Sequence, residues 1–294
     1  MVDKLKFQTE YPFKSQYFNT GSYHMHYVDE GKGPVLLMIH GNPTWSFYYR
    51  NLIKHFSKRY RVIAPDHIGC GLSDKPQEYP YTLQIHIDNL KTLVEHLDLK
   101  DVTLVVHDWG GPIGLGTFMD QPHLVKRLVI LNTGAFLGKD LKMPFRIQLV
   151  RVPILGSVAL KVFNAFAKGA LLMACNQNRL TKEIKAGYLA PYNNMHNRIG
   201  ILRFVQDIPW NENMESYHII QKIEKNLRQF SKIPILIVWG KKDFCFTEKF
   251  LAYWQKYFPQ AETHVFNDAG HYVLEDAHEK IIPVMENFLS KSLK

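Results

Sequence analysis

The stretch VVHDWGGPIG at residues 105–114 most narrows the folds that are open to this chain. It continues the apolar run DVTLVV at 101–106, whose β-branched residues are typical of a strand covered on both faces. Glycines follow at once, and the segment from there to about Met119 predicts a helix. A sharp bend from strand to helix would present Asp108 at the strand end and at a helix N-terminus, which favours a negative charge.

The residues around Asp108 suit a crowded corner. Gly110, Gly111 and Gly114 supply the small residues that such a bend requires. Val106 stands where the usual G-x-S-x-G turn has its first glycine, which is a departure from that form. An aspartate before two glycines can also be a simple helix N-cap, so the corner alone leaves a structural role for Asp108 open.

Short apolar segments and helical patterns alternate in the first part of the chain and again near its end. The other predicted strands are 24–31, 34–41, 126–133 and 233–240, while 60–71 predicts a strand that runs into a turn and 262–271 a strand followed by a loop. The other predicted helices are 81–99, 246–258 and 275–293. This rhythm predicts a parallel sheet wrapped by helices, with ligands at the carboxyl ends of the strands. The rhythm stops in a proline-punctuated, helix-patterned segment, so we expect a core of 1–136 and 229–294 and an inserted helical cap at 137–228.

Composition narrows the class of protein. Hydrophobic residues make up 46% of the chain, which is ordinary for a globular protein, and no window approaches the roughly 20 apolar residues of a membrane span. The N-terminus is charged and polar, so no secretory signal is expected. Cys70, Cys175 and Cys245 are few, odd in number and far apart, which suits packing roles in the reducing cytoplasm and offers no metal spacing. We expect no metal and no cofactor.

The net charge of +9 raises the question of an anionic partner. The basic residues are spread along the chain in runs no longer than two, and no nucleic-acid-binding motif accompanies them. We therefore expect no nucleic-acid partner, and a basic soluble enzyme whose charge at most attracts anionic substrates or products. The sequence does not predict whether the protein is a monomer or an oligomer.

Two further polar residues follow predicted strands near the end of the chain. Asp243 lies just past the strand at 233–240, and His271, one of fourteen histidines, lies in a glycine-containing loop after the last strand. A carboxylate beside an imidazole holds the ring in one tautomer. Nucleophile, acid and histidine in the order Asp108, Asp243, His271 match the chain order of the α/β-hydrolase fold.

Four segments resemble the haloalkane dehalogenase branch of the α/β-hydrolase superfamily. They are HGNPTWSFYYR (40–50), PDHIGCGLSDKP (65–76), HDWGG (107–111) and DAGHYVLED (268–276), within a similarity that runs from about residue 20 to 290. The extended forms NPTWSFYYR and RFVQDIP (203–209) resemble one subgroup, which includes the third dehalogenase group and the β-lactone decarboxylases of olefin synthesis. The resemblance implies a mostly parallel eight-stranded sheet flanked by helices, with an inserted helical cap.

The resemblance also implies a nucleophile and a leaving-group site. An ionised Asp108 would attack saturated carbon and form an alkyl ester, which water activated by His271 would hydrolyse. Asn42 and Trp109 would donate hydrogen bonds to a departing halide. Asn42 before Pro43 also suits a turn and Trp109 suits core packing, and backbone N–H groups near these two residues could bind the carboxylate oxygen during ester hydrolysis.

The position of the acid is open within the resembling family. Some dehalogenases carry it after the strand that here ends LVILNTGAF. This sequence has Asn132 and no carboxylate from Leu128 to Lys139, so Asp243 is the predicted acid. Asp140 comes late and is expected to open the cap.

The leading interpretation is haloalkane dehalogenation, in which a small apolar organic substrate gives an alcohol and a halide ion. The nearest rival is decarboxylation of a β-lactone to a cis-alkene and carbon dioxide by the same Asp–His–Asp set. Epoxide hydrolysis is a third option, for which the candidate proton donors are Tyr188, Tyr192 and Tyr217. A non-enzymatic hormone-binding use is not favoured, since receptor relatives usually carry serine. Candidate residues of an apolar tunnel, each also explicable by packing, are Phe136, Phe145, Phe163, Phe166, Leu172, Ile208, Trp210 and Leu274.

Overall fold

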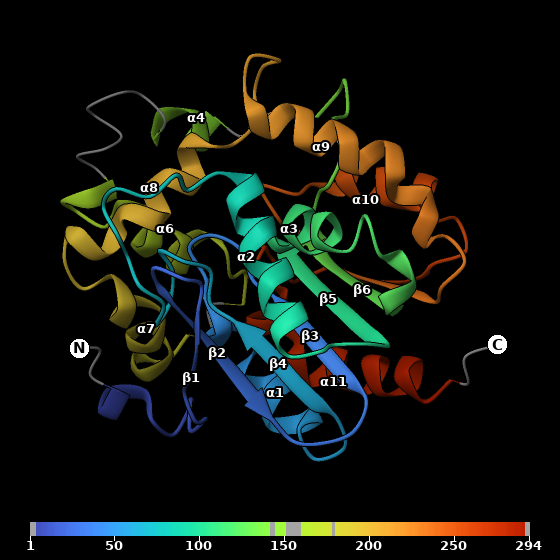
Figure 1. The fold of residues 1–294 in the computed structure, drawn as a ribbon, viewed down its shortest axis with the longest axis horizontal. Coiled ribbons are helices and arrows are strands. Elements are labelled where there is room, and N and C mark those ends of the chain that lie inside the picture. Colours follow the sequence, from blue (N-terminus) through green and yellow to red (C-terminus); the bar gives the residue numbers. More distant parts are fainter. Residues whose placement is uncertain (1–3, 142–144, 151–159, 178–179, 292–294) are drawn as a thin grey trace.

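The computed structural model describes residues 4–141, 145–150, 160–177 and 180–291 of the chain. Within these residues, eight strands form one sheet in the order β1-β2-β4-β3-β5-β6-β7-β8 (Figure 1). The strands are β1 (Gln16–Asn19), β2 (His24–Glu30), β3 (Val35–Ile39), β4 (Arg61–Pro65), β5 (Val102–Asp108), β6 (Val125–Thr133), β7 (Ile235–Gly240) and β8 (Glu262–Phe266). Strands β1 and β2 run antiparallel to their neighbours and the others pair in parallel. The predicted mostly parallel eight-stranded sheet is confirmed.

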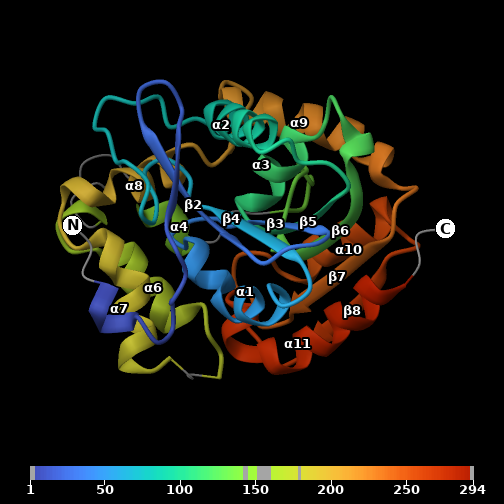
Figure 2. The same cartoon turned by 60° about the horizontal axis from the view of Figure 1, so that its bottom comes forward.

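Alternate side chains of the central strands enter two separate apolar cores. In β3, Leu37 and Ile39 join one core, while Leu36 and Met38 join the other. The flanking helices of the sheet are α1 (Arg50–Phe56), α2 (Leu83–His96), α3 (Gly110–Thr117), α10 (Glu248–Tyr257) and α11 (Val273–Ser290). Helices α2 and α3 cover one face and α1 and α11 the other (Figure 2). The central strands are therefore buried on both faces, which is why their sequences read as continuous apolar runs.

The structure contains two elements that were not predicted. Strand β1 is a four-residue edge strand with one buried side chain, and helix α1 has only seven residues. Within 60–71 the strand ends at Pro65 and a turn follows, as predicted, whereas β5 runs two residues past the predicted 101–106, to Asp108. The corner residue is therefore the last residue of its strand.

The described chain between β6 and β7, which we call the insertion, contains helices and turns but no strand. Its helices are α4 (Phe145–Val150), α6 (Ala165–Met173), α7 (Lys182–Leu189), α8 (Ile199–Gln206) and α9 (Glu215–Asn226). Helix α9 packs against α2 and α3 beside the sheet, whereas α6, α7 and α8 lie together at one side of the molecule in both views (Figures 1 and 2). None of the helices in the described ranges combines the length and apolar character that a bilayer-spanning segment needs.

Candidate active site

The corner that carries Asp108 is held in an unusual backbone conformation by close packing. Asp108 has φ +52°, in the left-handed region that non-glycine residues rarely adopt, and α3 starts two residues later. A Cβ atom on Gly110 would collide with the carbonyl of Ile39, and one on Gly111 would collide with the hydroxyl of Thr133. The glycines after Asp108 are therefore required by the close approach of strands β3 and β6.

The loop after β3 holds the Asp108 carboxylate. The backbone N–H of Asn42 donates to Oδ1 over 2.6 Å, and the backbone N–H of Trp109 donates to the same carboxylate. A Cβ on Gly41 would collide with the Asp108 side chain, so only glycine permits this approach. The side chain keeps 12% of its surface exposed, which leaves it reachable from the adjoining cavity.

His271 lies between the two carboxylates named from the sequence. Its Nε2 is 3.7 Å from Oδ2 of Asp108, and its Nδ1 is 2.8 Å from Oδ2 of Asp243. The other oxygen of Asp243 accepts hydrogen bonds from the backbone N–H groups of Cys245 (2.7 Å) and Phe246 (3.0 Å). Since Asp243 is fixed on both oxygens, it holds the imidazole with Nε2 toward Asp108.

The loop that carries His271 is tied to the core and to the insertion. His107 donates from Nε2 to the carbonyl of His271 over 2.9 Å, and Asp276 accepts from the backbone N–H of Gly270 over 2.7 Å. The backbone N–H of Tyr272 donates to the carbonyl of Ala174, at the C-terminal end of α6, over 2.8 Å. The position of the His271 imidazole thus depends on contacts with the core and with the insertion.

Burial and charge act in opposite directions on the two groups. Burial raises the pKa of Asp108 above its usual range, although His271 and the N–H groups of Trp109 and Asn42 act to lower it. Burial by itself would lower the pKa of His271, but the Asp243 charge, the hydrogen bond to it and the Asp108 charge raise that pKa above its usual range. The raised pKa of His271 favours a protonated imidazole, whereas the raised pKa of Asp108 works against ionisation of its carboxyl group.

Asn42 and Trp109 both adjoin Asp108, but their side chains are placed differently. The indole of Trp109 borders the cavity, whereas the amide nitrogen of Asn42 donates to the carbonyl of Ile201 in α8 over 3.3 Å. The amide oxygen of Asn42 is buried and has no hydrogen-bond partner among the described residues. One N–H of Asn42 is thus engaged by the insertion.

Helix α8 is the part of the insertion that packs against this corner. Phe204 stacks on His86 of α2, with ring centroids 4.4 Å apart and planes at 10°, and its ring also lies 5.4 Å from that of Trp109. Asp207, at the end of α8, accepts from the backbone N–H of Leu83 at the start of α2 over 2.7 Å. The RFVQDIP motif at 203–209 therefore joins the insertion to the core next to Asp108.

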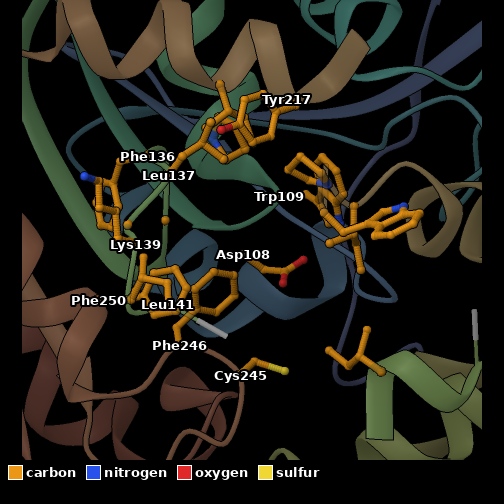
Figure 3. Close-up of a pocket in the computed structure, with 18 residues that line it drawn as sticks. Asp108, Trp109, Phe136, Leu137, Lys139, Leu141, Tyr217, Cys245, Phe246 and Phe250 are labelled. Carbon is orange, nitrogen blue, oxygen red and sulfur yellow. The ribbon is translucent and has the colours of Figure 1, made fainter. Parts of the chain in front are cut away.

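A cavity of about 440 Å³ opens beside Asp108. Figure 3 shows the Asp108 carboxylate near its centre, with Trp109 on one side and Phe246 on the other. Apart from Asp108 and Lys139 the lining is uncharged, and it consists of Trp109, Pro112, Gly134, Phe136, Leu137, Gly138, Leu141, Ile147, Ile208, Pro209, Trp210, Tyr217, Ile220, Cys245, Phe246 and Phe250. This lining suits an apolar substrate.

The cavity includes some of the tunnel residues considered from the sequence and not others. Phe136, Ile208 and Trp210 line it. The side chains of Phe145, Phe163 and Leu172 are exposed, Phe166 packs within the insertion and Leu274 lies in the core on the α11 face, and none of these five is a lining residue. Sequence reasoning missed Phe246 and Phe250, whose signal was their position just after Asp243.

The three tyrosines considered as proton donors for epoxide opening lie in different surroundings. Tyr188 is buried and donates its hydroxyl to Glu275, and Tyr192 is buried with its hydroxyl donating to the carbonyl of Thr44. Of the three, only Tyr217 lines the cavity.

The two other positions considered for the acid have structural partners. The side-chain amide of Asn132 exchanges hydrogen bonds with the backbone of Gly240, which joins β6 to the end of β7 just before Asp243. Asp140 accepts from the Tyr253 hydroxyl over 2.7 Å at the surface. Among the candidates, Asp243 is the carboxylate bonded to His271.

The three cysteines are free thiols, and Cys245 is the one that lines the cavity. Burial raises the pKa of the Cys245 thiol, with the Asp243 and Asp108 charges adding to the effect. In the described part of the chain, no cluster of three or more His, Cys, Asp or Glu side chains is arranged to hold a metal ion.

Comparison with known proteins places this chain in a family of enzymes. A family model described as the alpha/beta hydrolase fold matches residues 34–278. The chain is 45% identical over 285 residues to a cis-3-alkyl-4-alkyloxetan-2-one decarboxylase of Shewanella oneidensis, covering 96% of this chain and 90% of that one. A decarboxylase of the same name from Xanthomonas campestris is 43% identical, covering 91% of this chain and 93% of its own.

Haloalkane dehalogenases form a second group of relatives. Haloalkane dehalogenase 2 of Mycobacterium tuberculosis is 30% identical over 281 residues, covering 95% of this chain and 96% of that one. Among solved structures, the haloalkane dehalogenase DpaA from Paraglaciecola agarilytica superposes with a TM-score of 0.82 at 28% identity, covering 100% of this chain and 98% of that one.

Proposed function

This chain belongs to the alpha/beta hydrolase fold family, as its motifs predicted, and we propose that it converts cis-3-alkyl-4-alkyloxetan-2-ones, which are β-lactones, into cis-alkenes and carbon dioxide. The observation that carries the proposal is the identity to two decarboxylases of that name over nearly the whole chain. Identity to the named haloalkane dehalogenase is lower. The order of preference is therefore the reverse of the one that the motifs alone favoured.

Ring opening uses Asp108 as the nucleophile. A carboxylate oxygen of Asp108 attacks the ring carbon that bears the ring oxygen, from the side opposite to that oxygen. The new bond is an alkyl ester of Asp108, and the bond that breaks is the one from this carbon to the ring oxygen. The electron pair goes to that oxygen, so the former lactone carbonyl becomes a free carboxylate on the neighbouring carbon.

The protonated form of His271 suits this step. Its Nε2 lies 3.7 Å from Oδ2 of Asp108, close enough for an N–H to reach an oxygen held beside the nucleophile. Negative charge moves from Asp108 to the substrate carboxylate, and an imidazolium held by Asp243 stabilises it there. The indole N–H of Trp109 is a second donor at the same edge of the cavity.

Loss of carbon dioxide then completes the reaction without water. The electrons of the bond to the carboxylate form the carbon–carbon double bond, and the bond to the Asp108 oxygen breaks, which restores the Asp108 carboxylate. Backside attack places the Asp108 oxygen opposite the carboxylate across the future double bond. Elimination in that geometry keeps the two alkyl groups on the same side, so a cis-lactone gives a cis-alkene.

The cavity suits a substrate with two alkyl arms. Its walls come from the β6 end (Phe136), α9 (Tyr217) and the loop before α10 (Phe246), with Asp108 near the centre (Figure 3). The insertion supplies Ile208 and Trp210, and we propose that it acts as the cap of the site. Burial of both alkyl chains would provide most of the binding energy.

Haloalkane dehalogenation is the second candidate, and the observation that favours it is the indole of Trp109 beside the nucleophile. In that reaction Asp108 displaces a halide, and neutral His271 takes a proton from the water that hydrolyses the ester. Asn42 would be the second halide donor. Its amide nitrogen already donates to Ile201, so it has one N–H left for a halide.

Heavy-oxygen water separates the two reactions in one design. The protein is incubated in it with a cis-3,4-dialkyl β-lactone or with a 1-haloalkane, and alkene, halide and the mass of the Asp108 peptide are measured. Decarboxylation releases alkene and leaves Asp108 unlabelled, because no water enters the cycle. Dehalogenation releases halide and incorporates heavy oxygen into Asp108.

Two variants complete the test. Asp108→Asn should abolish both product signals, and His271→Gln should accumulate the alkyl ester of Asp108, formed from the haloalkane with loss of halide, if the protein is a dehalogenase. Release of halide with label in Asp108, and no alkene from the lactone, would replace the proposed function with the second candidate. Absence of both alkene and halide from the folded protein would refute both.

A further inference from the structure

The positive charge of the chain is concentrated in one part of it. Residues 137–228 contain fourteen Lys and Arg against six Asp and Glu, so this third of the sequence holds eight of the nine net positive charges. The basic residues are spread along the sequence, but most of the excess of basic over acidic residues lies in this segment. The remainder of the chain is close to neutral.

The same segment carries most of the large apolar side chains that face solvent. Of the ten in the described chain, seven lie in the insertion: Phe145, Val162, Phe163, Leu172, Met173, Met195 and Trp210. Scattered exposed apolar residues are normal on proteins, but their accumulation on one basic segment is not.

Helix α6 displays the pattern most clearly. Its buried stripe is Asn164, Ala167, Leu171 and Ala174, at helical spacing. The opposite stripe, together with the two residues before the helix, is exposed and forms what we call the α6 outer face: Val162, Phe163, Ala165, Lys168 and Leu172. Leu172 is 78% exposed and Phe163 64% exposed, with Lys168 between them in sequence. A solvent-facing helix normally presents polar residues there.

Hydrogen bonds hold the chain in place at both ends of α6. The guanidinium of Arg198 donates to the carbonyls of Lys161 (2.6 Å) and Val162 (2.9 Å), which fixes the chain just before the helix. At the other end Ala174 accepts from the backbone of Tyr272, in the His271 loop. Figures 1 and 2 both place α6 at the side of the molecule opposite α10. The apolar residues are therefore presented outward by ordered structure.

We propose that the α6 outer face binds to the surface of an anionic lipid bilayer. A short helix that combines large apolar side chains with lysine has the chemistry of an interfacial membrane-binding element, and the described residues 160–177 and 180–206, which hold α6, α7 and α8, contain six Lys and Arg against one Glu. A second copy of the chain fits less well, because a symmetric interface would bring two such basic surfaces together. The proposal does not depend on the proposed function, although a dialkyl lactone would also partition into a bilayer.

Vesicle sedimentation of the full chain tests this directly. Binding is compared between vesicles of phosphatidylcholine alone and vesicles that also contain phosphatidylglycerol, at low and high salt. We expect binding to the anionic vesicles that weakens as salt rises, because screening reduces the charge attraction. Equal binding to both kinds of vesicle, or none to either, would overturn the proposal.

Matched substitutions locate the surface. Phe163→Ser combined with Leu172→Ser should weaken binding at least about tenfold, because burying even one large apolar side chain is worth that factor. Lys168→Glu should also weaken it. The controls are Val265→Ser, 40% exposed on β8, and Lys58→Glu, exposed after α1, which should change binding less than about twofold.

Folding of each variant is checked by its thermal melt, and its oligomeric state by light scattering. Controls that weaken binding as much as the α6 variants would overturn the assignment to this face. Concentration-dependent self-association that the α6 double variant abolishes, without vesicle binding by the unaltered chain, would identify a second copy as the occupant instead.

Discussion

Substitution of Phe204 by leucine should lower both stability and turnover. The ring is 1% exposed and contacts the rings of His86, Trp109 and His67, at centroid distances of 4.4, 5.4 and 5.9 Å. Aromatic pairs contribute about 0.5–1.5 kcal/mol each beyond burial, so losing these three contacts should cost about 1.5–4.5 kcal/mol of unfolding free energy. Leucine also leaves the indole of Trp109 without its flat neighbour, and a misplacement of about 1 Å can cost up to about 10²-fold in rate.

The assay pairs urea unfolding with turnover of the β-lactone, and the control is Phe56→Leu. Phe56 is also 1% exposed and lies near two rings, those of His55 at 4.9 Å and Tyr60 at 5.9 Å, but it packs on the α1 side of the sheet. We expect a similar loss of stability in both variants, and a fall in kcat of about tenfold or more only for Phe204→Leu. If Phe204→Leu loses stability but keeps the kcat of the unaltered enzyme, Phe204 does not position Trp109.

Three further predictions concern the corner itself. Asp243→Asn should lower kcat by about 10²-fold or more while KM changes little, since the imidazole loses the carboxylate that orients and charges it; an unchanged kcat in alkene release would contradict this. Because burial raises the pKa of Asp108, kcat/KM should fall with decreasing pH at a pH above the ordinary aspartate range, and an acid limb at or below that range would argue against Asp108 as the nucleophile. Gly111→Ala should reduce the urea midpoint by an amount equivalent to about 1–3 kcal/mol through its collision with β6, whereas Gly169→Ala in α6 meets only a flexible methionine end and should be neutral or stabilising.

The sheet and the corner could be predicted because both depend on local sequence. A strand buried on both faces is continuously apolar, as in β5, and a left-handed corner needs small neighbours, as at Gly110. Strand β1 has one buried side chain and no alternation long enough to detect, so its place comes from pairing with β2. Elements that depend on a tertiary partner leave a weak signal in the sequence.

The candidate site also has some features that the sequence predicted and others that only the fold explains. Its chain order and its strand ends indicated that Asp108, Asp243 and His271 would lie near one edge of the sheet, and the structure gives their distances. The engagement of the Asn42 amide by Ile201 could not be foreseen, because it depends on the path of the insertion, some 159 residues further along the chain. Motif resemblance singled out RFVQDIP, but only the fold explains it, through the contacts of Phe204.

The two reactions considered for this chain would use one Asp–His–Asp arrangement, because the fate of the ester would be decided by the substrate. The alkyl ester formed from a haloalkane has no way forward except attack by water, so His271 must accept a proton. A β-lactone leaves its own carboxylate attached beside the ester, and loss of carbon dioxide from it is unimolecular, needing no water to enter the apolar cavity. In the free site the Asp243 and Asp108 charges raise the pKa of His271, and the protonated ring that this favours would stabilise the carboxylate formed on ring opening. The Asp108 contribution is lost once the ester forms, so in a hydrolytic reaction the ring would become easier to deprotonate at the step where it must accept a proton from water.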